Sequence, residues 1–105
     1  MARLSTHVLD TAHGRPAAGM CIRLYDEQRR LLREMTTNGD GRAGEPIDVP
    51  IGIYELVFGV GEYFGSKGTP FLGEVIVRFG IEDPDAGYHV PLLVSPYGYT
   101  TYRGS

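Results

Sequence analysis

The sequence has almost no lysine or cysteine and no long apolar run, and each shortage excludes a class of protein. Of its 10 basic side chains only Lys67 is a lysine; the others are scattered arginines, and the net charge is −3. Without a basic stripe, we expect no nucleic-acid partner. Cys21 is the only cysteine, which excludes an intramolecular disulfide and a thiolate metal cluster. Its apolar neighbours indicate a small buried hydrophobe rather than a nucleophile.

Apolar segments long enough for a membrane are missing as well. No stretch approaches the ~20 apolar residues that a membrane helix needs, so we expect no membrane partner. The first residues, from Met1 to Ser5, lack the apolar region of a secretory signal. The sequence therefore predicts a cytoplasmic protein.

Short apolar runs separated by turn residues predict an all-β fold, a sandwich of two small sheets in a single domain spanning residues 1–105. The Gly-rich stretch 59–73 predicts a loop with at most a short helix near Glu62 to Lys67. An irregular edge segment is expected around residues 47–49. Strands are expected at residues 4–10, 20–25, 31–37, 53–58, 74–82, 88–94 and 97–102.

Two histidines lie on predicted strands. His7 shares one face of its strand with Ser5 and Leu9, and His89 shares a face with Pro91. If the two strands are neighbours, a neutral imidazole of the pair could accept a proton from water, and the closeness of the rings would disfavour charging both. Each histidine alone also fits an ordinary strand position, and their spacing does not decide between these alternatives.

Arg42 follows the turn residues Asn38-Gly39-Asp40-Gly41. It is either a solvated loop arginine or an anchor for an anion or a carbonyl group, since a guanidinium offers five donors. His13 lies in another turn, where we expect an exposed side chain. The acidic residues are dispersed and form no calcium loop, so we expect no metal.

The C-terminal segment contains many side chains that could bind a ligand or take part in catalysis. Residues 88–105 combine a strand-like run, three tyrosines after Pro96, and the ending Tyr102-Arg103-Gly104-Ser105. Chain ends are usually frayed, but one this apolar should be docked. Its guanidinium, hydroxyl and terminal carboxylate would then be fixed parts of a site.

Taken together, these residues resemble the 5-hydroxyisourate hydrolase family, the transthyretin-like enzymes of urate breakdown. The terminal tetrapeptide distinguishes this family from transthyretin itself, a hormone carrier of the same fold. The stretch 59–73 of this chain departs from the pattern of the family. The resemblance covers nearly the whole chain and rests on the segments 4–10, 14–17, 37–42 and 88–105.

The resemblance implies a transthyretin-like sandwich of two four-stranded antiparallel sheets with one short helix. It also implies a homotetramer, a dimer of dimers, with active sites in a channel between the dimers and no cofactor. The implied substrate is 5-hydroxyisourate, which is hydrolysed to 2-oxo-4-hydroxy-4-carboxy-5-ureidoimidazoline. The alternatives are a small-molecule carrier without catalysis and a structural interaction domain. By motif, the implied catalytic set is His7, Arg42, His89 and Ser105, with Tyr102 and Arg103 binding substrate.

Overall fold

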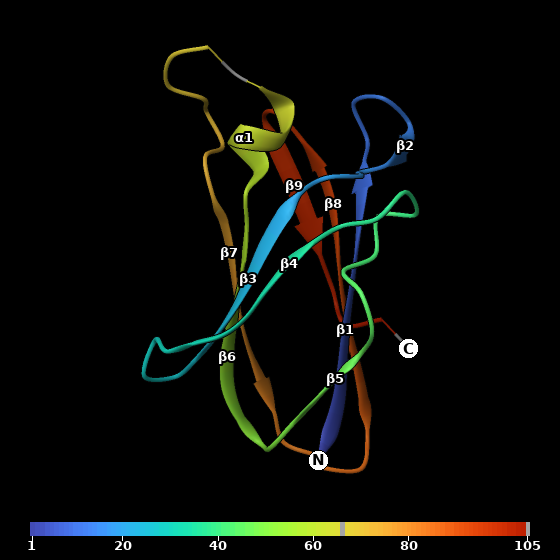
Figure 1. The fold of residues 1–105 in the computed structure, drawn as a ribbon, viewed down its shortest axis with the longest axis vertical. Coiled ribbons are helices and arrows are strands. Elements are labelled where there is room, and N and C mark those ends of the chain that lie inside the picture. Colours follow the sequence, from blue (N-terminus) through green and yellow to red (C-terminus); the bar gives the residue numbers. More distant parts are fainter. Residues whose placement is uncertain (66, 105) are drawn as a thin grey trace.

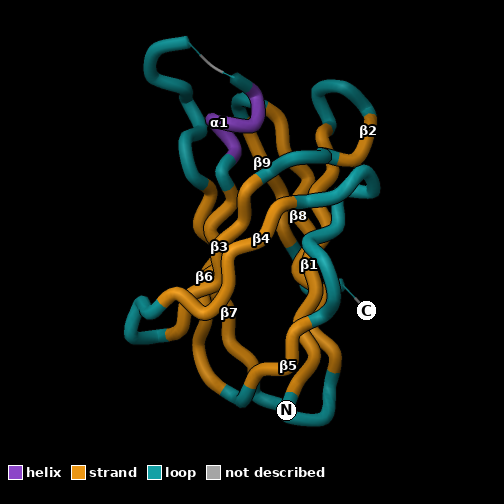
Figure 2. The backbone as a smooth tube through the Cα atoms, viewed as in Figure 1, coloured by secondary structure: helices purple, strands orange, loops and turns teal. Residues whose placement is uncertain are grey.

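The computed structural model describes residues 1–65 and 67–104. Within these residues, two sheets pack face to face, and a single short helix lies at one end of the sandwich (Figures 1 and 2). In chain order the elements are β1 (Ala2–Asp10), β2 (Arg15–Pro16), β3 (Cys21–Asp26), β4 (Leu31–Thr36), β5 (Ile47–Val49), β6 (Gly52–Phe58), α1 (Val60–Phe64), β7 (Val75–Ile81), β8 (Gly87–Ser95) and β9 (Gly98–Thr101).

The predicted transthyretin-like sandwich is confirmed, but one of its sheets is not fully antiparallel. One sheet has the order β4-β3-β6-β7, and the other has the order β2-β1-β8-β9, with β5 also paired to β1. The central pair β1–β8 is parallel, with Ser5 opposite His89 and His7 opposite Pro91. The expectation of antiparallel pairing throughout was wrong for this pair. All four strands of the other sheet lie between β1 and β8 in the chain, so the two strands are not joined by a hairpin, which would force them to be antiparallel.

The same sheet has five strands, although four were expected. Two of the five are short and pair with β1, β2 at Leu9 and Asp10 and β5 at Ala2 to Leu4. Arg15 and Pro16, which follow the predicted turn at His13, therefore form β2, and the edge segment 47–49 becomes a regular strand. Both extend the sheet beyond the free edge of β1.

The core lies between the sheets, and the strands follow the predicted alternation. On β1, Leu4 and Val8 are buried while His7 faces the other way and is half-buried. Phe58, at the end of β6, is fully buried together with Leu92 of β8. Burying each of these large side chains contributes about 1.5–3 kcal/mol. The core thus fixes which face of β1 and β8 is left for chemistry.

The helix α1 starts earlier and is shorter than the sequence suggested. It spans Val60–Phe64, not the region near Glu62 to Lys67. Tyr63 of α1 donates a hydrogen bond to the carboxylate of Asp10 at the end of β1, 2.7 Å away. This contact ties α1, which follows β6 of one sheet, to β1 of the other sheet.

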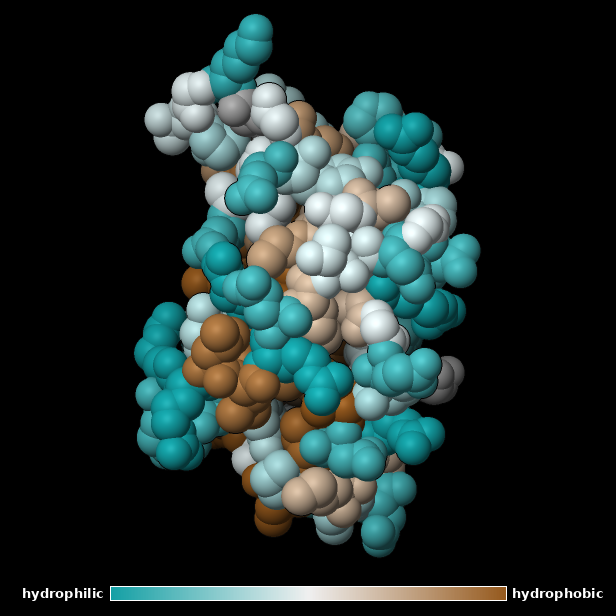
Figure 3. Space-filling model, in the orientation of Figure 1, coloured by the Kyte–Doolittle hydropathy of each residue, from teal (hydrophilic) through white to brown (hydrophobic). Residues whose placement is uncertain are grey.

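Two surface features complete the fold. Cys21 is half-buried, not buried as predicted, because it lies on the outer face of β3 while Ile22 and Leu24 point into the core. Apolar side chains gather on the lower half of the face drawn in Figure 3, and Leu31 and Leu32 at the start of β4 are about half exposed. Within the described residues, no helix is long and apolar enough to cross a membrane.

A candidate active site on the β1–β8 face

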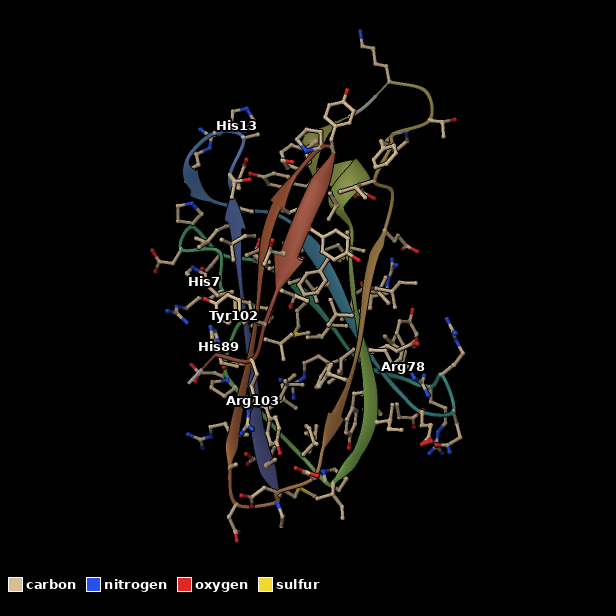
Figure 4. All side chains as sticks on the ribbon, turned by 180° about the vertical axis from the view of Figure 1, so that it is seen from behind. His7, His13, Arg78, His89, Tyr102 and Arg103 are labelled. Carbon is tan, nitrogen blue, oxygen red and sulfur yellow. The ribbon has the colours of Figure 1, made fainter. Side chains whose placement is uncertain are left out.

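The two strand histidines meet on the outer face of the β1–β8 pair. Ser5 lies opposite His89, and His7 lies opposite Pro91. The two histidines are therefore on adjacent strands, offset by two residues in register, and their side chains are on the same face of the sheet. Figure 4 shows them near each other at mid-strand, while His13 lies at the far end of the molecule. His7 and His89 are therefore neighbours on one face of the sheet, as their proposed pairing requires.

The His7 ring is held by the backbone of the turn that carries Arg42. Its Nε2 lies 2.7 Å from the carbonyl oxygen of Asp40. A carbonyl oxygen only accepts hydrogen bonds, so Nε2 carries the proton. In neutral His7 the nitrogen with the free lone pair is therefore Nδ1.

The turn that carries Arg42 packs tightly against β1 and brings the Arg42 backbone beside that of His7. The Val8 amide donates to the Gly41 carbonyl at 2.8 Å, and Arg42 pairs with His7 in an isolated bridge. Asn38 Oδ1 accepts from the amides of Asp40 and Arg42 and so shapes the turn. Gly41 has φ 77°, and a Cβ there would lie 2.4 Å from the Val8 carbonyl oxygen. Only glycine allows this approach.

Burial and the neighbouring charges favour the neutral form of His89. Burial of the ring lowers the pKa of His89 below its ordinary value of 6.5, and the nearby charges of Arg42 and His7 lower it further. The His89 ring also has a hydrogen-bond partner, because its Nδ1 lies 2.8 Å from Ser5 Oγ. A half-buried neutral imidazole beside a guanidinium can remove a proton from water.

The chain end crosses directly over His89. The Gly104 amide donates to the His89 carbonyl at 2.7 Å, and the two residues form an isolated antiparallel bridge. The expected docking of the C-terminal segment is thus found as far as Gly104. Ser105, the predicted catalytic residue that follows, lies outside the described residues.

The structure does not bring Arg103 to the histidine pair. Its guanidinium lies 4.1 Å from the centre of the Tyr88 ring and donates to the Gly87 carbonyl at 3.3 Å. Tyr88 is on the core-facing side of β8, opposite to His89. With Tyr102, Arg103 lines a cavity of about 610 Å³ between β7 and β8 that contains neither histidine.

Sequence reasoning missed the two groups that contact the histidines. Ser5 was recognised only as a neighbour on the His7 face, and a hydrogen bond to a strand 84 residues away has no local signal. The Asp40 contact uses a backbone carbonyl, which no side-chain pattern reveals. Among the described residues, no three His, Cys, Asp or Glu side chains gather as a metal site would require.

Comparison with known proteins identifies the family. A family model described as HIUase/Transthyretin family matches residues 4–104. The chain belongs to this family. A family member from Rhizobium meliloti strain 1021, named 5-hydroxyisourate hydrolase 2, is 54% identical, with 98% of this chain and 96% of the relative covered.

Solved structures of the HIUase/Transthyretin fold agree closely with this one. The Klebsiella pneumoniae 5-hydroxyisourate hydrolase superposes with a TM-score of 0.86 at 34% identity, covering 100% of this chain and 94% of that chain. An (S)-allantoin synthase superposes with a TM-score of 0.91 at 45% identity. This chain covers only 44% of the synthase, although 99% of it is matched, so the similarity concerns one part of that larger protein.

Proposed function

We propose that this chain hydrolyses 5-hydroxyisourate to 2-oxo-4-hydroxy-4-carboxy-5-ureidoimidazoline, a step of urate breakdown. The observation that carries the proposal is the meeting of His7, Arg42 and His89 on one face of the β1–β8 pair. The relatives named 5-hydroxyisourate hydrolase, at 54% and 34% identity, support the same activity.

Hydrolysis of the N1–C6 amide requires a nucleophilic water, stabilisation of the negative charge on the attacked oxygen, and a proton for the leaving nitrogen. His89 takes a proton from water as the water oxygen bonds to C6. Arg42 stabilises the resulting oxyanion through its guanidinium donors. When the C6–N1 bond breaks, His89 passes its proton to N1 and returns to the neutral form. His7 assists or exchanges roles with His89.

The C-terminal tetrapeptide completes the proposed site. Ser105 orients water or substrate through its hydroxyl or its terminal carboxylate, a role supported by the contact of Gly104 with His89. Tyr102 is more than half exposed and available to substrate. Arg103 stays a proposed substrate-binding residue, and its guanidinium contacts Tyr88 on the core-facing side of β8.

The proposed assembly is a homotetramer, a dimer of dimers. In the single chain the histidines lie on an open sheet face, and a second dimer covering that face would exclude water and strengthen the charges in the site. Light scattering after size-exclusion chromatography measures the assembly. A cytoplasmic location belongs to the same proposal, and fractionation of producing cells tests it.

The activity is tested by generating 5-hydroxyisourate from urate with urate oxidase in the cuvette. We expect this protein to accelerate the decay of the intermediate's ultraviolet absorbance and to produce the circular dichroism of a single enantiomer. Decay at the spontaneous rate, with folded tetrameric protein, would instead favour a small-molecule carrier and call for ligand screening.

Three variants test the site itself. His89→Asn, Arg42→Gln and removal of residues 102–105 should each lower turnover by about 10²–10³-fold while the oligomer persists. His13→Ala is the matched control, because His13 lies at the far end of the molecule; its turnover should be unchanged. Wild-type rates in all three variants would refute the site assignment.

A further inference from the structure

Ser5 is a hydrogen-bond partner of the His89 side chain, and the proposed mechanism gives it no role. Ser5 lies opposite His89 in the parallel register of β1 and β8. Its Oγ is 2.8 Å from His89 Nδ1, a normal hydrogen-bond length. Within residues 1–65 and 67–104, this is the only side-chain hydrogen bond of the Ser5 hydroxyl.

The His89 ring is held from two directions. Ser5 contacts Nδ1, while the Gly104 backbone lies against the Cγ–Cδ2 edge of the ring, where an added Cβ would be 2.7 Å from Cδ2. With Nδ1 occupied, Nε2 is the ring nitrogen left for the reaction. A histidine whose ring and tautomer are both fixed needs no rearrangement before it takes a proton.

We propose that Ser5 is a positioning residue for hydrolysis, whose hydroxyl oxygen accepts a hydrogen bond from His89 Nδ1–H and so presents the Nε2 lone pair to water. The proposal rests on the proposed function, since it assumes that His89 is the base. When Nε2 takes the water proton, Nδ1–H continues to donate to Ser5, so the same hydrogen bond holds both protonation states of the ring.

The proposed hydrogen bond gives the two histidines opposite tautomers. The Asp40 carbonyl can only accept, so the proton of neutral His7 is on Nε2, whereas acceptance by the Ser5 hydroxyl places the proton of neutral His89 on Nδ1. Because a hydroxyl is neutral, Ser5 orients His89 without adding a negative charge that would oppose the effects of burial and of Arg42 on its pKa.

The tautomer is measured directly by long-range ¹⁵N–¹H correlation spectra of histidine-labelled protein above pH 7. In the wild type, we expect a protonated Nδ1 and an unprotonated Nε2 for His89, and the reverse for His7. A protonated Nε2 on neutral His89 would overturn the proposal. This readout needs no turnover, so it separates failure of the Ser5 role from failure of the proposed hydrolase activity.

Substitutions then test what the hydrogen bond does. Ser5→Ala should lower kcat about 10-fold with little change in KM, which is less than the ~10²–10⁴-fold contribution of a general base. Its spectrum should gain the Nε2–H form of His89. Ser5→Thr retains a hydroxyl and a strand-compatible side chain, so it should recover most of the rate and the Nδ1–H tautomer.

A matched serine controls for loss of a hydroxyl in general. Ser95 ends β8, away from His89, and its hydroxyl contacts the turn to β9. Ser95→Ala should keep both the rate and the His89 tautomer. An active Ser5→Ala with an unchanged spectrum would overturn the positioning role, and equal losses in Ser5→Ala and Ser5→Thr would do the same.

Discussion

Gly104 and His89 are in direct contact across the C-terminal segment: the Gly104 amide donates to the His89 carbonyl at 2.7 Å, and the position of a Gly104 Cβ would fall 2.7 Å from the ring carbon Cδ2. No side chain can be added there unless the ring or the chain end moves. His89, the proposed base, and Gly104 of the C-terminal segment therefore pack as one structural unit.

Gly104→Ala should lower kcat by about 10²-fold, because even a 1 Å displacement of catalytic groups costs that much. Stopped-flow decay of 5-hydroxyisourate absorbance measures the loss. Gly98→Ala is the control: a Cβ at Gly98 meets nothing within 4 Å, so its kcat should match the wild type. Equal rates in both variants would contradict the proposed coupling.

The pH dependence should report the neutral state of His89. Burial, then Arg42 and His7, lower the pKa of His89 below 6.5, and only the neutral ring can take a proton from water. The acid limb of kcat/KM should therefore fall below pH 6.5. A limb at or above that value would assign the base to another group.

The same shift affects stability with a defined sign. Folded His89 binds a proton less readily than it does in the unfolded chain, so its protonation disfavours folding. The cost is absent well above pH 6.5 and grows as the pH falls through that value. Urea unfolding of the wild type and His89→Asn between pH 5 and pH 8 should show the two stabilities converging or crossing on the acid side.

Arg42→Gln should move this titration as well as slow the reaction. Removing the guanidinium removes the second cause of the lowered His89 pKa, so the acid limb should shift to higher pH, while kcat falls by about 10²–10³-fold through loss of the oxyanion donor. Histidine NMR titration measures the shift. Arg78→Gln is the control, since Arg78 pairs with Glu55 on the other sheet and should leave the His89 titration unchanged.

The sequence predicted local features of the fold well and its long-range pairing poorly. The period-2 alternation correctly placed Ser5, His7 and Leu9 on one face of β1, because alternation is a local property of a strand. The parallel β1–β8 pairing could not be predicted, since the connection between these strands is long enough for either direction. The family resemblance, not periodicity, supplied the expectation that His7 and His89 meet.

In the candidate site, too, the sequence predicted local features but not contacts between distant segments. The Asn38–Arg42 turn followed from its Asn, Asp and Gly residues, but its docking on Val8 depends on a backbone hydrogen bond between distant segments. Arg103 was grouped with the histidines because the family resemblance implied it through the terminal tetrapeptide. Residues next to each other in an extended segment point in different directions, and here Arg103 turns toward Tyr88.

His13 was expected to be a plain exposed turn residue, and its side chain is indeed 55% exposed. The structure adds a hydrogen bond of 2.7 Å from its ring to the buried Asp10 carboxylate. Asp10 also accepts from Tyr63 of α1 at 2.7 Å. This cluster joins β1, the following turn and the helix, so it should affect stability rather than turnover.

Tyr63→Phe should lower the free energy of unfolding by about 1.5–3 kcal/mol, the usual contribution of a hydrogen bond to a charged group. Burial raises the pKa of Asp10, but hydrogen bonds from Tyr63 and His13 outweigh it and leave the pKa lowered. The stability from Asp10 is therefore present above its ordinary value of 3.8 and lost as the pH falls through its folded pKa. Urea unfolding at pH 7 and across pH 2–5 should show the wild type losing its stability advantage over Tyr63→Phe in acid.

Tyr97→Phe is the control, because it removes a hydroxyl from a side chain that is 79% exposed. Its free energy of unfolding should equal that of the wild type at every pH. A constant difference in stability between the wild type and Tyr63→Phe across this pH range would mean that the Asp10 charge does not contribute.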